Sequence, residues 1–292
     1  MSHPVRIGLK YAPMGTTPER MREVWIAADQ AGFDHLWIMD HFMPLVRSAT
    51  GWYQFEPTDP VFEAWTTLAA MAEVVKRIRI GVNVTGNLYR NPSVLAKTAA
   101  TVDQFSGGRL EFGIGASWAE FEFTTLGIPF PPARERMERL AEACEVLKLL
   151  WTRDVSDYEG RYYQLRGAIS EPKPVQRPHP PIWIGGSGEK RLLRIAAQHA
   201  DVWNIVGGQP DEVSRLSRVL DEHCEEVGRN PDDIRRSIGV PFRPDDPERT
   251  KRDAEALVER GFTELLITVK GDDAPRQVDE AAEMLLGLKV SP

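Results

Sequence analysis

Short apolar runs alternate with amphipathic segments along almost the whole chain. Runs of aliphatic and aromatic residues predict strands at residues 5–11, 34–39, 78–84, 110–115, 181–185, 201–206, 236–241 and 263–269. Apolar residues at spacings of three and four predict helices at 18–31, 61–76, 92–106, 132–151, 188–199, 211–227, 247–260 and 274–287. Each predicted strand is therefore followed by one predicted helix.

This strict alternation is typical of the (β/α)8 TIM barrel, an α/β fold of about this chain length. The near-continuous apolar runs at 78–82 and 110–115 fit parallel strands that are covered on both sides. An open doubly wound sheet is the competing arrangement. Its usual GxGxxG turn after the first strand is absent, because residues 10–15 read KYAPMG. We therefore predict one TIM-barrel domain over residues 1–292.

Three segments exceed the minimal repeat. Residues 42–60 form a long aromatic loop after the second strand, and a further loop follows the fourth strand. Residues 152–180 form an insertion between the fourth helix and the fifth strand, with a possible hairpin at 158–163 and a proline-rich, extended run at 171–181. Long loops at the carboxyl ends of barrel strands usually build the active site.

Composition excludes several classes of function. The chain has 36 Lys and Arg against 43 Asp and Glu, a net charge of −7, and no basic stripe, so nucleic acid is not an expected partner. Cys144 and Cys224 form no CxxC or Cys/His cluster, so neither a disulfide framework nor a metal site is expected. No apolar run suits a signal or membrane segment, and we expect a cytoplasmic protein.

The fourth predicted strand ends in unusually small residues. In the stretch GRLEFGIGASW at 108–118, Gly113, Gly115, Ala116 and Ser117 leave the backbone open to the approach of a flat ring. Alternatively, small residues merely terminate a packed strand.

Other strand ends carry polar or glycine-rich groups. Asp40 and His41 follow the second strand, where His41 suits proton transfer near neutral pH, although both residues also suit a loop cap. Asn83 and Thr85 end the third strand, and Trp203 with Asn204 ends the sixth.

The fifth strand ends in a glycine-rich turn that opens a predicted helix. Gly185, Gly186, Ser187 and Gly188 suit an anion such as phosphate, with Lys190, Arg191 and Arg194 nearby. Helix capping with a solvated basic face is the alternative. Because motifs such as HExxH and GxSxG are absent, we expect a cofactor to carry the chemistry.

Taken together, these segments resemble the luciferase-like monooxygenase superfamily, and within it the oxidoreductases that use the deazaflavin coenzyme F420. The motifs that carry the resemblance are GFDHLW (32–37) with DHF (40–42), TGNLYRNP (85–92), SGGRL (106–110) with GIGASW (113–118) and Glu122, EPKP (171–174), and GGSG (185–188) with ADVWN (200–204).

The resemblance implies a TIM barrel, a cis peptide at Asn83-Val84 behind the cofactor ring, and a homodimer. It implies catalytic roles for His41 and Asp40. The residues implied to bind F420 are Asp40, Asn83, Val84, Thr85, Gly115, Ala116, Ser117, Gly185, Gly186, Ser187 and Gly188. For the substrate pocket we expect Phe42, Trp52, Trp118 and Trp203.

The sequence departs from one branch of this group. The sugar-phosphate dehydrogenases have a catalytic glutamate where this chain has Trp118, which argues against glucose-6-phosphate as the substrate. The expected activity is hydride transfer between F420 and a small organic substrate.

Two alternatives stay open. The first is an FMN-dependent monooxygenase of the same superfamily, and the second is a non-catalytic flavin-binding protein. The oligoglutamate tail of F420 favours a basic exit groove, for which Lys190, Arg191, Arg194 and Arg90 are candidates, whereas FMN ends at its phosphate.

Overall fold

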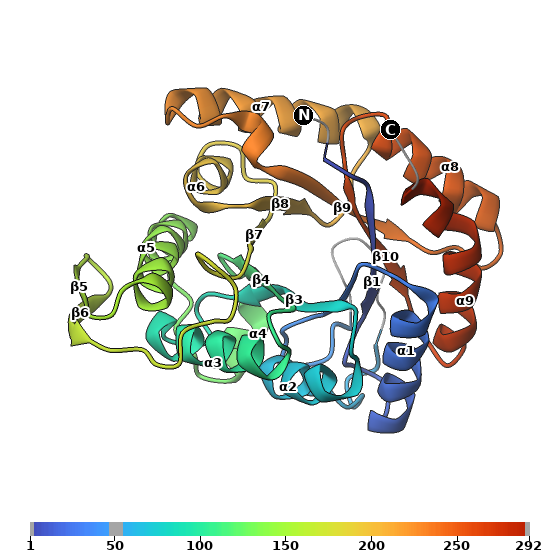
Figure 1. The fold of residues 1–292 in the computed structure, drawn as a ribbon, viewed down its shortest axis with the longest axis horizontal. Helices are drawn as coiled ribbons and strands as arrows, with labels where there is room; N and C mark the ends of the chain where they lie inside the picture. The colour runs from blue at the N-terminus through green and yellow to red at the C-terminus, as the bar shows by residue number, and fades with distance from the viewer. Residues whose placement is uncertain (1–2, 47–54, 290–292) are drawn as a thin grey trace.

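A computed structural model describes residues 3–46 and 55–289 and contains a closed barrel of eight parallel strands (Figure 1). The strands run around the barrel in the order β1-β10-β9-β8-β7-β4-β3-β2. They are β1 (Arg6–Tyr11), β2 (His35–Ile38), β3 (Arg79–Gly86), β4 (Leu110–Gly115), β7 (Ile182–Gly185), β8 (Val202–Ile205), β9 (Arg235–Pro241) and β10 (Glu264–Val269). The predicted TIM barrel is confirmed, because β1 pairs with β10 and closes the sheet.

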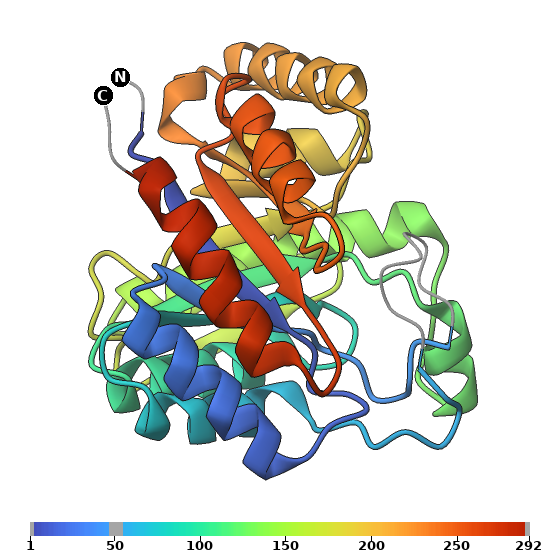
Figure 2. The same ribbon diagram turned by 90° about the vertical axis from the view of Figure 1, so that its right-hand side faces the viewer.

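Helices cover the outside of the barrel. They are α1 (Pro18–Ala31), α2 (Ala64–Val74), α3 (Pro92–Phe105), α4 (Glu120–Thr125), α5 (Ala133–Thr152), α6 (Leu192–His199), α7 (Pro210–Glu226), α8 (Pro247–Val258) and α9 (Ala274–Leu285), with 3-10 turns at Pro231–Asp233 and Leu286–Lys289. Figure 2 shows α1 and α9, from opposite ends of the chain, side by side on the barrel. No helix in the described part of the chain is long and apolar enough to cross a membrane.

The predicted insertion contains the predicted hairpin. Strands β5 (Ser156–Glu159) and β6 (Gln164–Ala168) pair antiparallel and lie outside the barrel, beside α5 (Figure 1). The peptides before Pro172 and Pro178 in the following proline-rich run are cis.

Two local expectations differ from the structure. The short helix α4 occupies the loop after β4, where no helix is expected from the sequence. The helix expected from residue 188 begins at Leu192, because residues 189–191 form a turn and the Leu193 amide donates to the Gly188 carbonyl at 3.1 Å. The glycine-rich turn therefore stands one turn away from the helix and does not open it directly.

Two tryptophans close the barrel interior below the carboxyl ends of the strands. Trp37 on β2 and Trp183 on β7 are fully buried, and their rings meet across the barrel at 4.5 Å between centroids. Their indole N–H groups donate to His35 at 2.8 Å and to Glu111 at 2.6 Å, so both polar edges are satisfied. Side chains two residues further along a strand point to the same face, so any space above this layer opens towards the carboxyl ends.

Strand β3 is irregular at the point where it enters that space. Its pairing with β4 shifts register between Val82 and Thr85, and the Asn83-Val84 peptide is cis, as the family resemblance implies. The bulge directs the Val84 side chain between β4 and β7, the two strands that come next around the barrel.

Glycines on these two strands make room for Val84. A Cβ at Gly115 would lie 2.9 Å from a Val84 methyl, and one at Gly185 would lie 3.0 Å from both methyls. At Gly113 it would lie 2.1 Å from the Val82 carbonyl oxygen and 3.1 Å from Val84. The small residues of β4 thus accommodate the bulge of β3. The sequence alone suggests instead that they make room for a flat ring.

We expect Gly113→Ala to destabilise the fold. The added methyl would overlap a backbone oxygen that cannot rotate away, so the free energy of unfolding should fall by about 1–3 kcal/mol or more. Urea denaturation measures this change. Gly287→Ala is the matched control, because a Cβ there meets nothing within 4 Å. Equal stability of the two variants would contradict the close packing of the bulge.

Candidate active site

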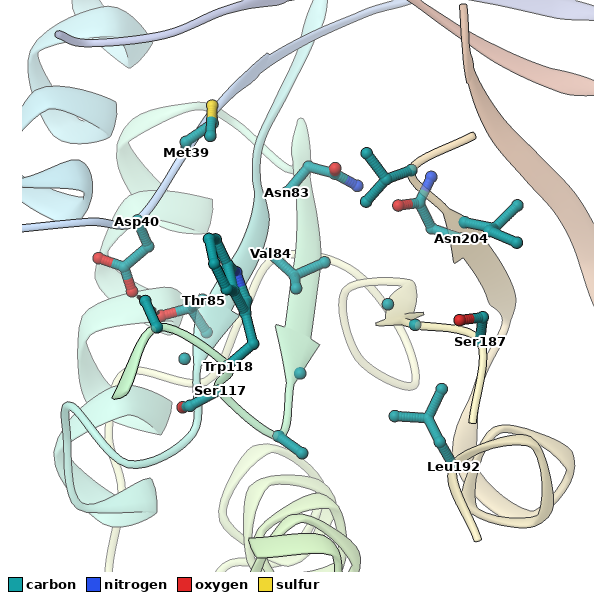
Figure 3. A pocket seen from close by; sticks show the side chains of 18 of the residues that line it. Met39, Asp40, Asn83, Val84, Thr85, Ser117, Trp118, Ser187, Leu192 and Asn204 are labelled. Carbon is teal, nitrogen blue, oxygen red and sulfur yellow. Dashed lines mark hydrogen bonds between the residues drawn. The ribbon is translucent and has the colours of Figure 1, made fainter. Parts of the chain in front are cut away.

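A cavity of about 490 Å³ opens at the carboxyl ends of the barrel strands (Figure 3). Every residue that the family resemblance implies for cofactor binding or catalysis lines it. These residues are Asp40, His41, Asn83, Val84, Thr85, Gly115, Ala116, Ser117, Gly185, Gly186, Ser187 and Gly188. Val84 lies in the middle of the view in Figure 3, with Asp40, Thr85 and Trp118 on one side and Asn204 and Ser187 on the other.

Of the four expected substrate-pocket residues, Trp118 lines the cavity. Trp203 does not: it is fully buried and donates its indole N–H to the Gly186 carbonyl at 2.8 Å, so it supports the glycine-rich turn from behind. Phe42 also lies outside the lining, where its ring packs edge-on against Tyr89 at 4.9 Å. Trp52 falls outside the described residues.

Asp40 is a buried, neutralised carboxylate. Its two oxygens accept from both terminal nitrogens of Arg90, at 2.7 and 3.1 Å, and one also accepts from the Thr85 hydroxyl. Arg90 in turn pairs with Glu63. Burial alone would lower the pKa of Arg90, but the two carboxylates of Asp40 and Glu63 outweigh this effect and raise it. Because both terminal nitrogens of Arg90 donate to carboxylates, Arg90 is not a free cation for the cofactor tail, contrary to the expectation from the sequence.

His41 is held by a second buried carboxylate, Glu122 on α4. The Nδ1 atom of His41 lies 2.9 Å from a Glu122 oxygen, and the other Glu122 oxygen accepts from the amides of Phe42 and Met43. The Tyr89 hydroxyl donates to Glu122 as well. Burial alone would raise the pKa of Glu122, but these donors lower it below its ordinary value of about 4.5.

The charge of Glu122 fixes the tautomer of His41. An ionised carboxylate accepts hydrogen bonds only, so the proton on the His41 ring must sit on Nδ1. The Nε2 atom is then the ring nitrogen left for a ligand in the cavity that His41 lines. Trp118 packs edge-on against the imidazole, 5.7 Å between ring centroids, and limits its movement.

Two buried side-chain polar atoms of the lining have no partner within the described protein. They are the Ser117 hydroxyl and the Asn83 side-chain nitrogen. Ser117 has a left-handed backbone with φ of 64°, and its carbonyl accepts from Arg136. A bound polar ligand would supply the missing partners.

Lys10 is a lining residue that the sequence reasoning missed. It is 8% exposed, and its ammonium donates to the Asn83 side-chain oxygen at 3.0 Å. Burial lowers its pKa to about 8. The sequence did contain a signal: Lys10 is a lysine inside an otherwise apolar strand. Because side chains alternate between the two faces of a strand, a lysine there can point into the barrel.

The glycine-rich turn also lines the cavity, with Ser187 and Gly188 exposed. Of the basic residues expected near it, Arg194 pairs with Glu226, whereas Lys190 and Arg191 are exposed. In the ranges 3–46 and 55–289, no group of three or more His, Cys, Asp or Glu residues could hold a metal ion.

Comparison with curated proteins finds relatives across most of the chain. The F420-dependent glucose-6-phosphate dehydrogenase of Microbacterium testaceum is 30% identical over 250 residues, which cover 84% of this chain and 70% of that protein. An uncharacterized protein of Mycobacterium tuberculosis is 29% identical over 268 residues, 88% of this chain and 91% of its own length.

Solved structures share the fold over nearly the full length. An F420-dependent secondary alcohol dehydrogenase in complex with an F420-acetone adduct aligns with a TM-score of 0.85 at 21% identity, covering 98% of this chain and 99% of that one. The oxygenating constituent of the 3,6-diketocamphane monooxygenase from Pseudomonas putida, in complex with FMN, aligns with a TM-score of 0.76 at 16% identity, covering 99% and 100%.

The family model described as luciferase-like monooxygenase matches residues 1–286, almost the whole chain. With the barrel and the relatives above, this match identifies the family. The chain belongs to the luciferase-like monooxygenases.

Proposed function

We propose that this protein is an F420-dependent oxidoreductase that transfers hydride between the coenzyme and a small organic substrate. The observation that carries the proposal is the buried His41–Glu122 pair at the wall of a cavity that also holds the Val84 bulge. Relatives named F420-dependent dehydrogenases support the choice of cofactor.

The lining residues fit a flat ring that carries a phosphate side chain. Val84 offers an apolar surface for the ring, while the unpartnered Ser117 hydroxyl and Asn83 amide offer hydrogen bonds to its polar edges. The backbone and hydroxyl at Gly186 to Gly188 would hold the phosphate. We assign cofactor binding to the same residues that the resemblance implies, from Asp40 to Gly188. When bound, F420 supplies or accepts a hydride.

His41 would handle the proton that accompanies the hydride. In reduction of a carbonyl, the imidazolium form of His41 would donate its Nε2 proton to the substrate oxygen, and in oxidation of an alcohol Nε2 of the neutral ring would accept one. Glu122 holds the imidazole in position through Nδ1 in both directions. Asp40, ion-paired with Arg90, contributes to the shape of the wall.

The substrate we propose is an uncharged molecule and not a sugar phosphate. The family resemblance implies that Trp118 stands where the sugar-phosphate branch has a glutamate, and Trp118 lies beside His41. Apart from His41, Lys10 is the cationic residue among the described lining residues, and it lies at the bottom of the cavity. A phosphate near the rim would find no charged partner in the described lining.

An FMN-dependent monooxygenase is the second candidate, favoured by the FMN-bound structural neighbour. We further propose that the protein acts as a homodimer in the cytoplasm, as a single domain over residues 1–292, without nucleic-acid or membrane partners. The acidic net charge of −7 supports the last of these points.

Separate titrations with F420 and FMN test the proposed cofactor. We expect quenching of F420 fluorescence on binding and weaker or no binding of FMN. The ring and phosphate sites fit both cofactors, but the exposed Lys190 and Arg191 favour the acidic tail that only F420 carries. Tight FMN binding without F420 binding would overturn the proposal. Bound F420 that no ketone, aldehyde or alcohol ever oxidises or reduces would instead indicate a non-catalytic binding protein.

His41→Ala should lower turnover and spare cofactor binding. Loss of a positioned proton donor costs about 10²- to 10⁴-fold in kcat. The measurement is anaerobic oxidation of reduced F420 by the small ketone or aldehyde that the unchanged enzyme reduces fastest. His223→Ala on α7 is the control, because that ring contacts Glu226 and the Glu189 carbonyl outside the cavity. Unchanged turnover in His41→Ala would remove this residue from the mechanism.

Glu122→Gln should destabilise the protein in a pH-dependent way. Because the folded protein lowers the pKa of Glu122, its stabilisation is complete above about pH 5 and is lost as the pH falls through the folded pKa. We expect the variant to lose roughly 1–3 kcal/mol of unfolding free energy at pH 7, with the difference narrowing below pH 4.5. Chemical denaturation across this range measures it, with the exposed Glu120→Gln as control. A difference that does not change with pH would refute the ionised state of Glu122.

A further inference from the structure

The cation at the bottom of the cavity has no counter-ion among residues 3–46 and 55–289. Lys10 pairs in register with Trp37, whose side chain belongs to the layer that closes the barrel, and with Thr268 on β10. Its ammonium has one hydrogen bond, to Asn83. Among the residues that the structure describes, no carboxylate forms an ion pair with it, and no neighbouring charge contributes to its pKa.

A buried, unpaired ammonium costs several kcal/mol in solvation, so its retention calls for a compensating partner. Its pKa of about 8 leaves it mostly protonated at neutral pH. The partner must therefore be a group with negative charge or strong acceptor character that enters from the cavity. Asn83 adds a donor at the same place, since its side-chain nitrogen is buried and unpartnered.

The floor also continues into a second, smaller cavity of about 10 Å³, roughly the size of one water. Lys10, Asn83 and Asn204 line both cavities, and the unpartnered Thr268 hydroxyl joins them in the smaller one. Figure 3 shows Asn83 and Asn204 on the same side of Val84, away from Asp40. The polar groups at the bottom of the barrel thus form one cluster that faces the cavity.

We propose that Lys10 and Asn83 bind the negatively charged, hydrogen-bond-accepting edge of the reduced cofactor ring and so raise the affinity for reduced over oxidised F420. This proposal rests on the proposed function. Oxidation of an alcohol breaks a substrate C–H bond and forms a C–H bond on the ring, which gains two electrons and one proton and hence one negative charge. The hydroxyl proton goes to His41. A cation at the floor favours that charge electrostatically.

The floor suits the cofactor better than a substrate carboxylate. His41 follows Trp37 by four residues and so lies nearer the rim than Lys10, and the substrate must contact His41 to exchange a proton. Asn83 is joined directly to Val84, which offers the ring its apolar surface. Asn83, which Lys10 contacts, and the proposed ring surface are therefore neighbours on one strand segment of β3.

The test compares Lys10→Met with the unchanged protein. Dissociation constants for oxidised F420 come from fluorescence, those for reduced F420 from anaerobic competition, and the potential of the bound coenzyme from equilibration with a redox dye. We expect Lys10→Met to weaken binding of the reduced form about 10-fold more than the oxidised form. That ratio corresponds to a potential lower by about 30 mV for a two-electron couple.

Two further variants make the result specific. Lys148→Met replaces a half-buried lysine on α5, outside the cavity, and should change neither constant. Asn83→Asp keeps Lys10 but places a carboxylate beside its ammonium, so this variant should also weaken binding of the reduced form more than that of the oxidised form. It replaces Lys10→Met in the test if circular dichroism shows that Lys10→Met does not fold.

The outcomes separate the two proposals. If the unchanged protein binds neither form of F420, the proposed function fails. If it binds both, and Lys10→Met weakens them equally or not at all, the role of Lys10 is wrong. Loss of affinity for carboxylate-bearing substrates alone, with the cofactor constants unchanged, would also overturn it.

Discussion

The packing of Val84 is the constraint on which the candidate site depends. Its side chain leaves β3 at a bulge and fills the space beside β4 and β7, so a Cβ at Gly115 or Gly185 would crowd the Val84 methyls. The same displacement turns Asn83 towards Lys10 and sets Thr85 against Asp40. One irregular segment therefore orients the apolar surface of the cavity, its polar floor and one of its walls, while the tryptophan layer below keeps the space closed.

Much of this arrangement could be predicted from the sequence, because parallel strands bring their carboxyl ends together. Any polar or small residue just after an apolar run then lies near the others, which is why residues as distant as Asp40 and Gly188 line one cavity. The barrel itself followed from the regular alternation of strands and helices. The hairpin of the insertion followed from a glycine between aromatic residues, at Gly160.

What the sequence did not provide is the direction of side chains and their partners. Trp203 and Asn204 are adjacent on one strand and point to opposite faces, so only Asn204 reaches the cavity. The alternation of side chains along a strand is enough to predict that the two cannot both line it. The neutralisation of Arg90 by Asp40 depends on contacts 50 residues apart, and the bond between Glu122 and His41 on contacts 81 residues apart. No local pattern encodes such pairs, since they arise only when the loops meet over the barrel.

The two charged groups that flank Val84, Asp40 and Lys10, differ in their partners, and this difference bears on the chemistry. Asp40 has a complete set of partners in Arg90 and Thr85, so its carboxylate is ion-paired and fully hydrogen-bonded. In the part of the chain that the structure describes, Lys10 has a single neutral partner, so the floor keeps a positive charge in a place where solvent screens it little. A pocket with a positive charge at its floor attracts a ligand whose negative charge lies deep. It also admits an uncharged substrate at the mouth beside His41. This division suits the proposed hydride transfer, because the negative charge moves with the hydride while the proton is exchanged separately at the imidazole.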